Sequence, residues 1–171
     1  MLIVLPLSSQ SYNEHILKIE ANIIPRIILM DYNVEDKLVD GKITIAVLHN
    51  PTDMVTAQKI EKFLKEKYPN GLKHYPIAVR LLPYTALTEH SPRATLYYLM
   101  DSNLANIKNA IGIANRYRAL AFSHDAQNLR YGAHISLRID KKIIPYINPA
   151  SLKESKISLR PALFAISELF Q

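Results

Sequence analysis

Residues 43–53 read ITIAVLHNPTD. The first six of these residues form a short, continuously apolar run, which is typical of a strand buried on both faces. The His-Asn-Pro turn ends the run, and Thr52 or Asp53 is expected to cap a helix over residues 54–67. A buried strand followed directly by a helix indicates an α/β fold with a parallel sheet.

The same alternation continues along the chain. We expect further strands over residues 77–82, 94–100 and 118–123, with a helix over residues 103–115 between the last two. Such strand–helix alternation implies right-handed crossovers between parallel strands. Tyr97 and Tyr98 are neighbours in one strand, so one ring is expected to point inward and the other outward.

An amphipathic helix is expected before the first strand. Residues 13–30 read NEHILKIEANIIPRIILM and place isoleucines at intervals of three and four, which is the helical period. Asn13 or Ser11 is the expected cap, and Pro25 is expected to kink the helix. The wide apolar stripe suits either the protein's own core or a partner, and we favour the core.

The pattern changes after Gly132. Alternating residues at 134–139 and 143–147 predict a hairpin with one solvated face, and the chain is expected to end in a helix near residues 159–170, with Ser158 as its cap. Residues 12–171 should therefore form a single α/β domain: a three-layer sandwich with a mixed, mostly parallel sheet and a C-terminal antiparallel hairpin.

Composition excludes several classes of protein. The chain has 171 residues and no Cys, which rules out disulfides, thiolate zinc sites, iron–sulfur ligation and a cysteine nucleophile. Because the chain contains only 4 Gly, we do not expect a glycine-rich nucleotide-binding loop. A chain of this length is expected to bury roughly 70% of its extended surface, so it needs no structural metal.

Residues 1–11, MLIVLPLSSQS, form an apolar leader. It lacks a basic start, its apolar part is too short for a complete signal sequence, and it falls well short of the roughly 20 residues that span a bilayer. Two interpretations stay open: a secretory signal whose true start lies upstream of Met1, or an ordinary buried strand. No other segment is expected to span a membrane.

The formal net charge is +6, from 21 Lys and Arg against 15 Asp and Glu. Positive charge is concentrated after residue 57, but its cations are scattered singly and alternate with glutamates, as on a solvated helix face. No run of basic and aromatic residues resembles a nucleic-acid platform, so we do not expect nucleic acid as a partner.

Polar residues follow the predicted strands at their carboxyl ends, where open parallel sheets bind ligands. The candidate ligand-binding residues are Asn50, Thr52, Asp53, Tyr84, Asp101, Ser102, Ser123, His124 and Asp125. As a site, helix N-termini after Thr52 and Ser102 would present N–H groups to an anion. Alternatively, the residues at 52, 53, 101 and 102 are only helix caps, which is the interpretation we favour.

No catalytic motif is readable. His49, Asp53, His124 and Asp125 are of types that ligate zinc, but no HExxH or paired-histidine spacing joins them. Asp101 and Ser123 occupy strand ends as in a response-regulator receiver, yet the first strand ends in His-Asn instead of adjacent carboxylates. There is no GxSxG elbow either. We therefore expect no enzyme activity, no cofactor and no metal.

Three stretches carry a family resemblance. Residues 18–24 read KIEANII, residues 43–48 read ITIAVL, and the chain closes with INPA at 147–150 and KISLRPAL at 156–163. These stretches are similar to the opening helix, the first strand and the closing strand, turn and helix of the YfiR-like family. The likeness covers most of the chain. The family's cysteines are absent, and so is the Trp-Pro that often ends its first helix.

The YfiR-like proteins are small periplasmic regulators that repress a membrane-bound diguanylate cyclase. The resemblance implies a non-enzymatic periplasmic protein in cyclic-di-GMP signalling, with the leader as a signal-peptide remnant. The implied partner is the periplasmic portion of a membrane signalling protein, and a homodimer is a further expectation. Candidate partner-binding residues are Ile23, Ile24, Ile27 and Ile28 in the first helix, and Leu163 and Phe164 near the C-terminus.

The alternative hypothesis is a different class of function. In it, the chain is a solute-binding protein or receptor component, with its pocket at the carboxyl ends of the parallel strands.

Overall fold

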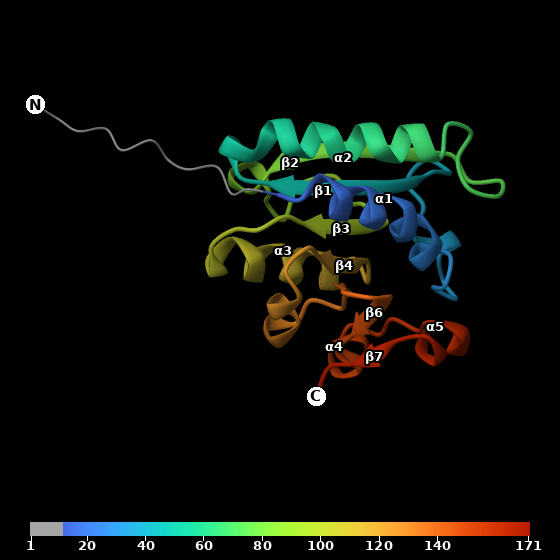
Figure 1. Cartoon of the computed structure of the whole chain (residues 1–171). Coiled ribbons are helices and arrows are strands. Elements are labelled where there is room, and N and C mark those ends of the chain that lie inside the picture. The colour runs from blue at the N-terminus through green and yellow to red at the C-terminus, as the bar shows by residue number, and fades with distance from the viewer. Residues whose placement is uncertain (1–11) are drawn as a thin grey trace, which may run out of the picture.

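The computed structural model describes residues 12–171, so the leader predicted over residues 1–11 lies outside the described residues. Residues 12–171 form a seven-stranded sheet in the order β2-β1-β3-β4-β5-β6-β7 (Figure 1). The strands are β1 (Ile43–His49), β2 (Ile77–Pro83), β3 (Leu96–Leu99), β4 (Leu120–Ser123), β5 (Ile135–Ile139), β6 (Ile143–Ile147) and β7 (Glu168–Leu169). Strands β1 to β5 are parallel, and β6 runs antiparallel to β5. The predicted α/β class, the mostly parallel sheet and the hairpin are confirmed.

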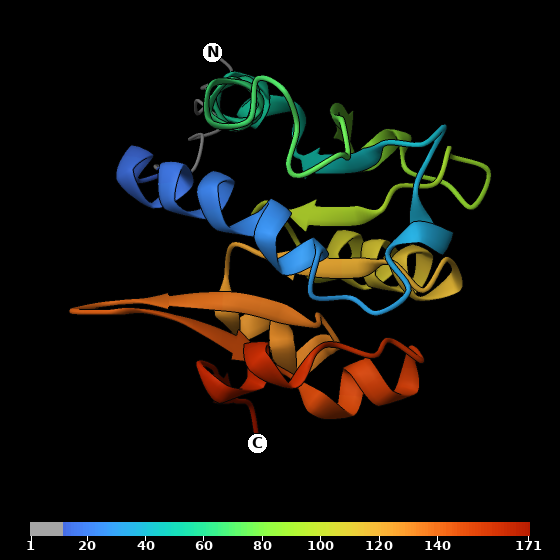
Figure 2. The ribbon, with the colours of Figure 1, turned by 90° about the vertical axis from the view of Figure 1, so that its right-hand side faces the viewer.

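Helices cover both faces of the sheet. The helices are α1 (Glu14–Ile28), α2 (Met54–Lys67), α3 (Leu104–Arg116), α4 (Pro149–Glu154) and α5 (Pro161–Ala165). Helices α1 and α2 lie beside one another (Figure 2) and share an apolar core with one face of the sheet, whereas α3 packs with a second core on the other face. The result is the three-layer sandwich that the alternation predicts.

The strands are buried because both faces are covered. All seven residues of β1 are buried, as its continuously apolar sequence indicates. Tyr97 and Tyr98 point to opposite faces, but the expectation that one ring points outward is wrong: both are fully buried, one in each core. The Tyr98 ring stacks on Phe122 with 5.7 Å between centroids.

Helix α1 begins where the sequence predicts. Asn13 is its cap, and the Asn13 side chain accepts hydrogen bonds from the backbone N–H groups of His15 and Ile16. The alternative cap, Ser11, lies outside the described residues. Pro25 is buried inside the helix, three residues from its end.

The residues predicted to bind a partner lie mostly in the core. Ile24, Ile27, Ile28 and Leu163 are at most 3% exposed, and Ile23 and Phe164 are partly buried against the same core. The partner interpretation of the four buried side chains is therefore wrong for this structure. The core interpretation of the first helix is confirmed, since an apolar stripe of this kind covers the sheet.

The predicted C-terminal helix over residues 159–170 is wrong in its extent. Only α5 is helical there; α4, which the sequence did not predict, precedes it, and Arg160 instead of Ser158 is the cap of α5. Leu169 pairs with Ile147 of β6, and the backbone N–H of Phe170 donates to the Ile147 carbonyl. Residues 168–170 therefore form hydrogen bonds with the open edge of β6, although their local apolar spacing favours a helix.

Among residues 12–171, no helix is long and apolar enough to cross a membrane.

The strand order places a topological switch point at the carboxyl ends of β1 and β3. After β1 the chain passes through α2 on one face, and after β3 it passes through α3 on the other. Because β1 and β3 are neighbours, their connections part at their carboxyl ends, which is where open α/β sheets bind ligands. This topological switch point locates the candidate site.

Candidate functional site

Asn50 joins the ends of β1 and β3 at the switch point. Its Nδ2 group donates to the Asp101 carbonyl at 2.9 Å and to Asp53 Oδ2 at 3.2 Å, and its Oδ1 accepts from Ser102 Oγ at 2.6 Å. Asn106 on α3 donates in turn to Ser102 Oγ. One side chain therefore ties together two loops that lie 51 residues apart in the sequence.

The interpretation of these polar residues as helix caps, which we favoured from sequence, is confirmed for the position of Asp53 and is wrong for Asp101 and Ser102. Asp53 occupies the cap position of α2, but in the described chain its side chain makes no capping hydrogen bond. Helix α3 is capped by Asn103, which accepts from the backbone N–H of Asn106, and not by Asp101 or Ser102. Thr52 is exposed in the short 3-10 turn between β1 and α2.

Three acceptor atoms at the switch point are shielded from solvent and have no hydrogen-bond partner among residues 12–171. They are His49 Nε2, Asp53 Oδ1 and Asp101 Oδ1; the fourth such atom in the described chain, Ser136 Oγ, is in β5. His49 is fully buried and its Nδ1 lies 2.7 Å from the Asn50 carbonyl, so Nδ1 carries the proton and Nε2 is an acceptor. Such orphaned groups are rare in folded proteins and require an explanation.

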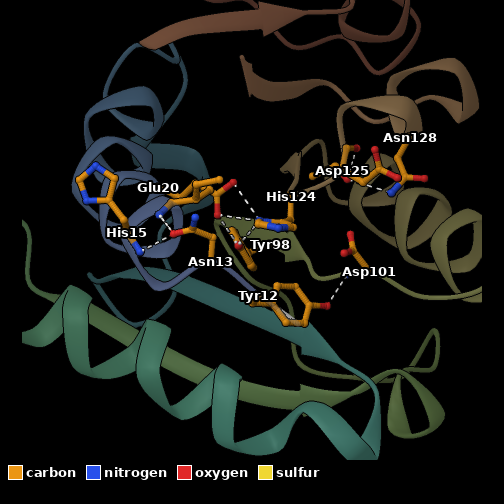
Figure 3. Close-up of polar contacts among 11 residues, drawn as sticks. Tyr12, Asn13, His15, Glu20, Tyr98, Asp101, His124, Asp125 and Asn128 are labelled. Atoms are coloured by element: carbon orange, nitrogen blue, oxygen red, sulfur yellow. Dashed lines mark hydrogen bonds and ion pairs between the residues drawn. The ribbon is translucent and has the colours of Figure 1, made fainter. Parts of the chain in front are cut away.

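A second polar group, formed by Glu20, Tyr98 and His124, lies beside the first (Figure 3). Glu20 on α1 is 2% exposed, and its Oε2 accepts the Tyr98 hydroxyl at 2.6 Å. His124 Nδ1 lies 3.0 Å from the same oxygen and 3.1 Å from Oε1. The carboxylate therefore holds both the strand β3 tyrosine and the histidine that follows β4.

Tyr12 connects the two groups, as Figure 3 shows. Its hydroxyl accepts the backbone N–H of Asp101 at 3.0 Å, and its ring lies 5.1 Å from the His124 ring, centroid to centroid. Burial, with the nearby charges of Asp101 and Asp53, raises the pKa of Tyr12. Its hydroxyl therefore stays protonated and neutral at physiological pH.

Charge at the site is mainly negative. Burial raises the pKa of Asp101, an effect that the charge of His124 opposes and neighbouring carboxylates reinforce. Burial alone would lower the pKa of His124, but the hydrogen bond and charge of Glu20, with Asp101 and Asp125, outweigh burial and raise it. The carboxylates around His124 thus favour its protonated form.

The structure brings five of the predicted ligand-binding residues together around the ends of β1, β3 and β4: Asn50, Asp53, Asp101, Ser102 and His124. Tyr84 is buried and donates to the Met100 carbonyl, which holds the loop after β3. Ser123 donates to the Asp125 carbonyl, and the Asp125 side chain caps the next 3-10 helix, so both shape the turn after β4.

Sequence reasoning missed Glu20, Tyr12 and Tyr98 as members of the site. A signal was present for Glu20: it follows Leu17 by three residues and precedes Ile24 by four, so a carboxylate lies on the buried stripe of α1. Within residues 12–171, no three His, Asp or Glu side chains converge closely enough to hold a metal ion.

No protein-family model matches the chain, and no curated protein matches it. Among solved structures, it is similar to a conserved domain protein from Vibrio cholerae, with a TM-score of 0.62 and 15% identity over 91% of this chain and 60% of that one. It is also similar to an ABC domain in complex with L-Trp from Streptococcus pneumoniae, with a TM-score of 0.57 and 9% identity over 85% of this chain and 61% of that one. The chain thus spans about 60% of the length of each neighbour, and at these identities the likeness shows the α/β fold.

Proposed function

We propose that this chain is a non-enzymatic small-molecule binding protein, a solute-binding or receptor component, whose ligand sits at the carboxyl ends of β1 and β3. The observation that supports it is the gathering of three orphaned acceptors, His49 Nε2, Asp53 Oδ1 and Asp101 Oδ1, at the topological switch point. An unsatisfied buried polar atom costs about 1–3 kcal/mol. A ligand that donates hydrogen bonds to all three recovers that free energy on binding.

The ligand class follows from charge. The site contributes the carboxylates of Asp53 and Asp101, with Glu20 nearby, and the one cation His124 is already paired with Glu20. An anion at the N-termini of α2 and α3, the alternative left open from sequence, is disfavoured because Asp53 at the N-cap of α2 and Asp101 just before α3 carry the same charge as such a ligand. A compound with a primary ammonium group supplies both positive charge and several donors, so we propose an amine or amino acid as the ligand.

A thermal-shift and calorimetric screen of the purified chain tests this proposal. The panel contains primary amines, amino acids that include L-Trp, matched carboxylates without an amine, sugars and inorganic anions. We expect an amine-bearing compound to raise the melting temperature, since a ligand that binds only the folded state stabilises it. No response to any amine at millimolar concentration contradicts the proposal.

Two isosteric variants locate the site. Asp53→Asn and Asp101→Asn remove one charge each, and we expect each to weaken binding by about tenfold or more, because charge-assisted hydrogen bonds are worth about 1.5–3 kcal/mol. Asp140→Asn is the matched control, since Asp140 is an exposed aspartate in the turn between β5 and β6. Without ligand, Asp53→Asn should be at least as stable as the wild type, since a buried carboxylate with an orphaned oxygen is lost. Unchanged affinity in both site variants refutes this location.

Repression of a membrane-bound diguanylate cyclase from the periplasm, which the YfiR-like resemblance implies, stays a separate prediction, as does a homodimer. Both functions are compatible, since a ligand that prefers one of two states shifts the affinity for a partner. A docking surface would have to lie outside Ile24, Ile27, Ile28 and Leu163, because these side chains are buried.

A further inference from the structure

A hollow of about 460 Å³ lies at the opposite edge of the sheet from the candidate site. Helix α1 runs across the sheet (Figure 1), with Tyr12 near the strand ends at its start and the hollow at its end. Its lining residues are Arg26, Leu29, Met30, Leu72, Lys73 and Arg160. Its volume falls within the range of about 300–1,000 Å³ that small-molecule sites occupy.

The floor of the hollow is apolar. Leu29 and Met30, which follow α1, are partly buried against the core that α1 and α2 share with the sheet, and Leu72 is also partly buried. Such a floor offers an apolar ligand a surface that it can cover without displacing the core.

The rim of the hollow is cationic, with Arg26, Lys73 and Arg160 all exposed. In the described part of the chain, none of the three is paired with a carboxylate, whereas Lys18, Lys59 and Lys65 on α1 and α2 each have a glutamate. No Asp or Glu is among the lining residues. The positive potential of the rim is therefore not neutralised locally.

The nearby carboxylates are engaged elsewhere. Asp31 forms a buried ion pair with Lys37, and Glu35 accepts the Tyr75 hydroxyl at 2.8 Å. An anionic ligand in the hollow can therefore pair with the three cations, because neither Asp31 nor Glu35 is paired with them.

Arg160 is held in place before any ligand arrives. Its guanidinium lies 4.9 Å from the centre of the Tyr32 ring, and its backbone N–H donates to the Met30 carbonyl at 2.8 Å. A guanidinium stacked in this way loses less freedom when it binds a carboxylate in bidentate fashion. Arg26 has a second role, because a cation in the last turn of α1 also stabilises the helix end.

We propose that this hollow is a binding site for a small amphipathic carboxylate, in which the carboxylate lies between Arg26 and Arg160 and an apolar tail covers Leu29, Met30 and Leu72. Both the charge and the apolar tail of the ligand are needed to match the lining. An inorganic anion leaves the apolar floor uncovered, and a neutral apolar compound leaves the cations of the rim unpaired. The site is independent of the amine site at the other edge of the sheet.

Octanoate, octanol and octylammonium have the same number of carbon atoms and differ in head group, so they test the proposal directly. Calorimetry on the full chain should detect octanoate binding, and octanol should bind more weakly. Because a primary ammonium is also the ligand class proposed for the site at the carboxyl ends of β1 and β3, octylammonium is compared through the amide signals of the hollow, which it should not shift. In ¹H–¹⁵N spectra, octanoate should shift the amide signals of Leu29, Met30, Leu72 and Arg160. Absence of octanoate binding at millimolar concentration, or equal binding of octanol, overturns the proposal.

The double variant Arg26→Gln/Arg160→Gln removes two of the three cations. We expect it to weaken octanoate binding by about five- to tenfold, the effect of losing two exposed ion pairs. The control is Arg130→Gln, an exposed arginine that does not line the hollow. Thermal melts by circular dichroism establish that each variant is folded. Unchanged octanoate affinity in the double variant contradicts the site.

A binding experiment with lipid vesicles distinguishes a soluble carboxylate from an anionic membrane surface as the ligand of the hollow. Co-sedimentation compares phosphatidylglycerol with phosphatidylcholine vesicles, and we expect no difference that depends on Arg26 and Arg160. Arginine-dependent binding to phosphatidylglycerol vesicles, together with no binding of octanoate, would assign the hollow to an anionic membrane and overturn the small-molecule proposal.

Discussion

Replacing Glu20 with Gln tests whether the contact between α1 and His124 carries charge. Glu20 is 2% exposed and the His124 side chain 16%, and Glu20 Oε2 accepts from both the Tyr98 hydroxyl and His124 Nδ1. At about pH 5.5, where His124 is protonated, we expect Glu20→Gln to reduce the free energy of unfolding by about 1.5–3 kcal/mol, the net value of a hydrogen bond to a charged group.

The effect has a defined pH dependence. The folded-state pKa of His124 is raised above its ordinary value of 6.5. The stability that His124 contributes is therefore fully present below 6.5 and is lost as the pH rises through the folded-state pKa. At about pH 9 the coupling between Glu20 and His124 should be smaller than at about pH 5.5, because the imidazole loses its proton as the pH rises through its raised folded-state pKa.

Urea denaturation followed by far-ultraviolet circular dichroism measures the coupling, through a cycle of Glu20→Gln, His124→Gln and the double variant at both pH values. Glu154→Gln, an exposed glutamate on α4, is the control and should change stability by no more than about 0.5 kcal/mol. A coupling energy within about 0.3 kcal/mol of zero at the lower pH refutes the reasoning, and so does a coupling that does not change with pH.

Two other buried groups give further predictions. Lys37→Met should cost about 3–5 kcal/mol in urea denaturation because it leaves Asp31 charged and buried, and the double variant with Asp31→Asn should cost less; a loss below about 1 kcal/mol contradicts this. His134 accepts the Ala121 N–H at Nδ1, and burial lowers its pKa to about 4. Since the neutral form is favoured in the fold, the stability it contributes is present above about 6.5 and declines by about 1.4 kcal/mol per pH unit towards pH 4. Titration of its imidazole by NMR measures this, and a midpoint near 6.5 contradicts it.

The parts of the fold that depend on local pattern were predictable. The apolar run of β1 and the helical periods of α2 and α3 each lie within a single stretch of sequence. Asn50 and Pro51 follow the end of β1, Pro69 to Gly71 follow α2, and Asn103 precedes α3. Residues 166–170 carry an apolar helical spacing as well, but the edge of β6, some 20 residues earlier, competes for their backbone. A long-range pairing of this kind is not visible in a local window.

The residues of the candidate site also fall into those that a local pattern predicts and those that depend on long-range contacts. Asn50, Asp101 and His124 were predicted because each follows an apolar strand, and parallel strands end at one edge. Glu20 was not predicted as their neighbour, since it lies 104 residues from His124 and belongs to a helix that precedes every strand seen in residues 12–171. At α3 the competing cap interpretation failed because Asn103, one residue after Ser102, has the same capping chemistry and takes the position, whereas at α2 Asp53 occupies the predicted cap position.

The partner of Glu20, His124, is 104 positions away, so during synthesis Glu20 in α1 is made well before the residue that it contacts in the folded protein. At about 5–20 residues per second, a ribosome takes roughly 5–20 s to add the chain between Glu20 and His124. During that interval α2 can already cover part of α1, since Tyr68 on the C-terminal side of α2 donates to the Asn22 carbonyl. Helix α1, which precedes the other helices of the described residues, is thus among the last of them to reach its final electrostatic environment, and a nascent chain that stops before β4 carries Glu20 without its contact to His124.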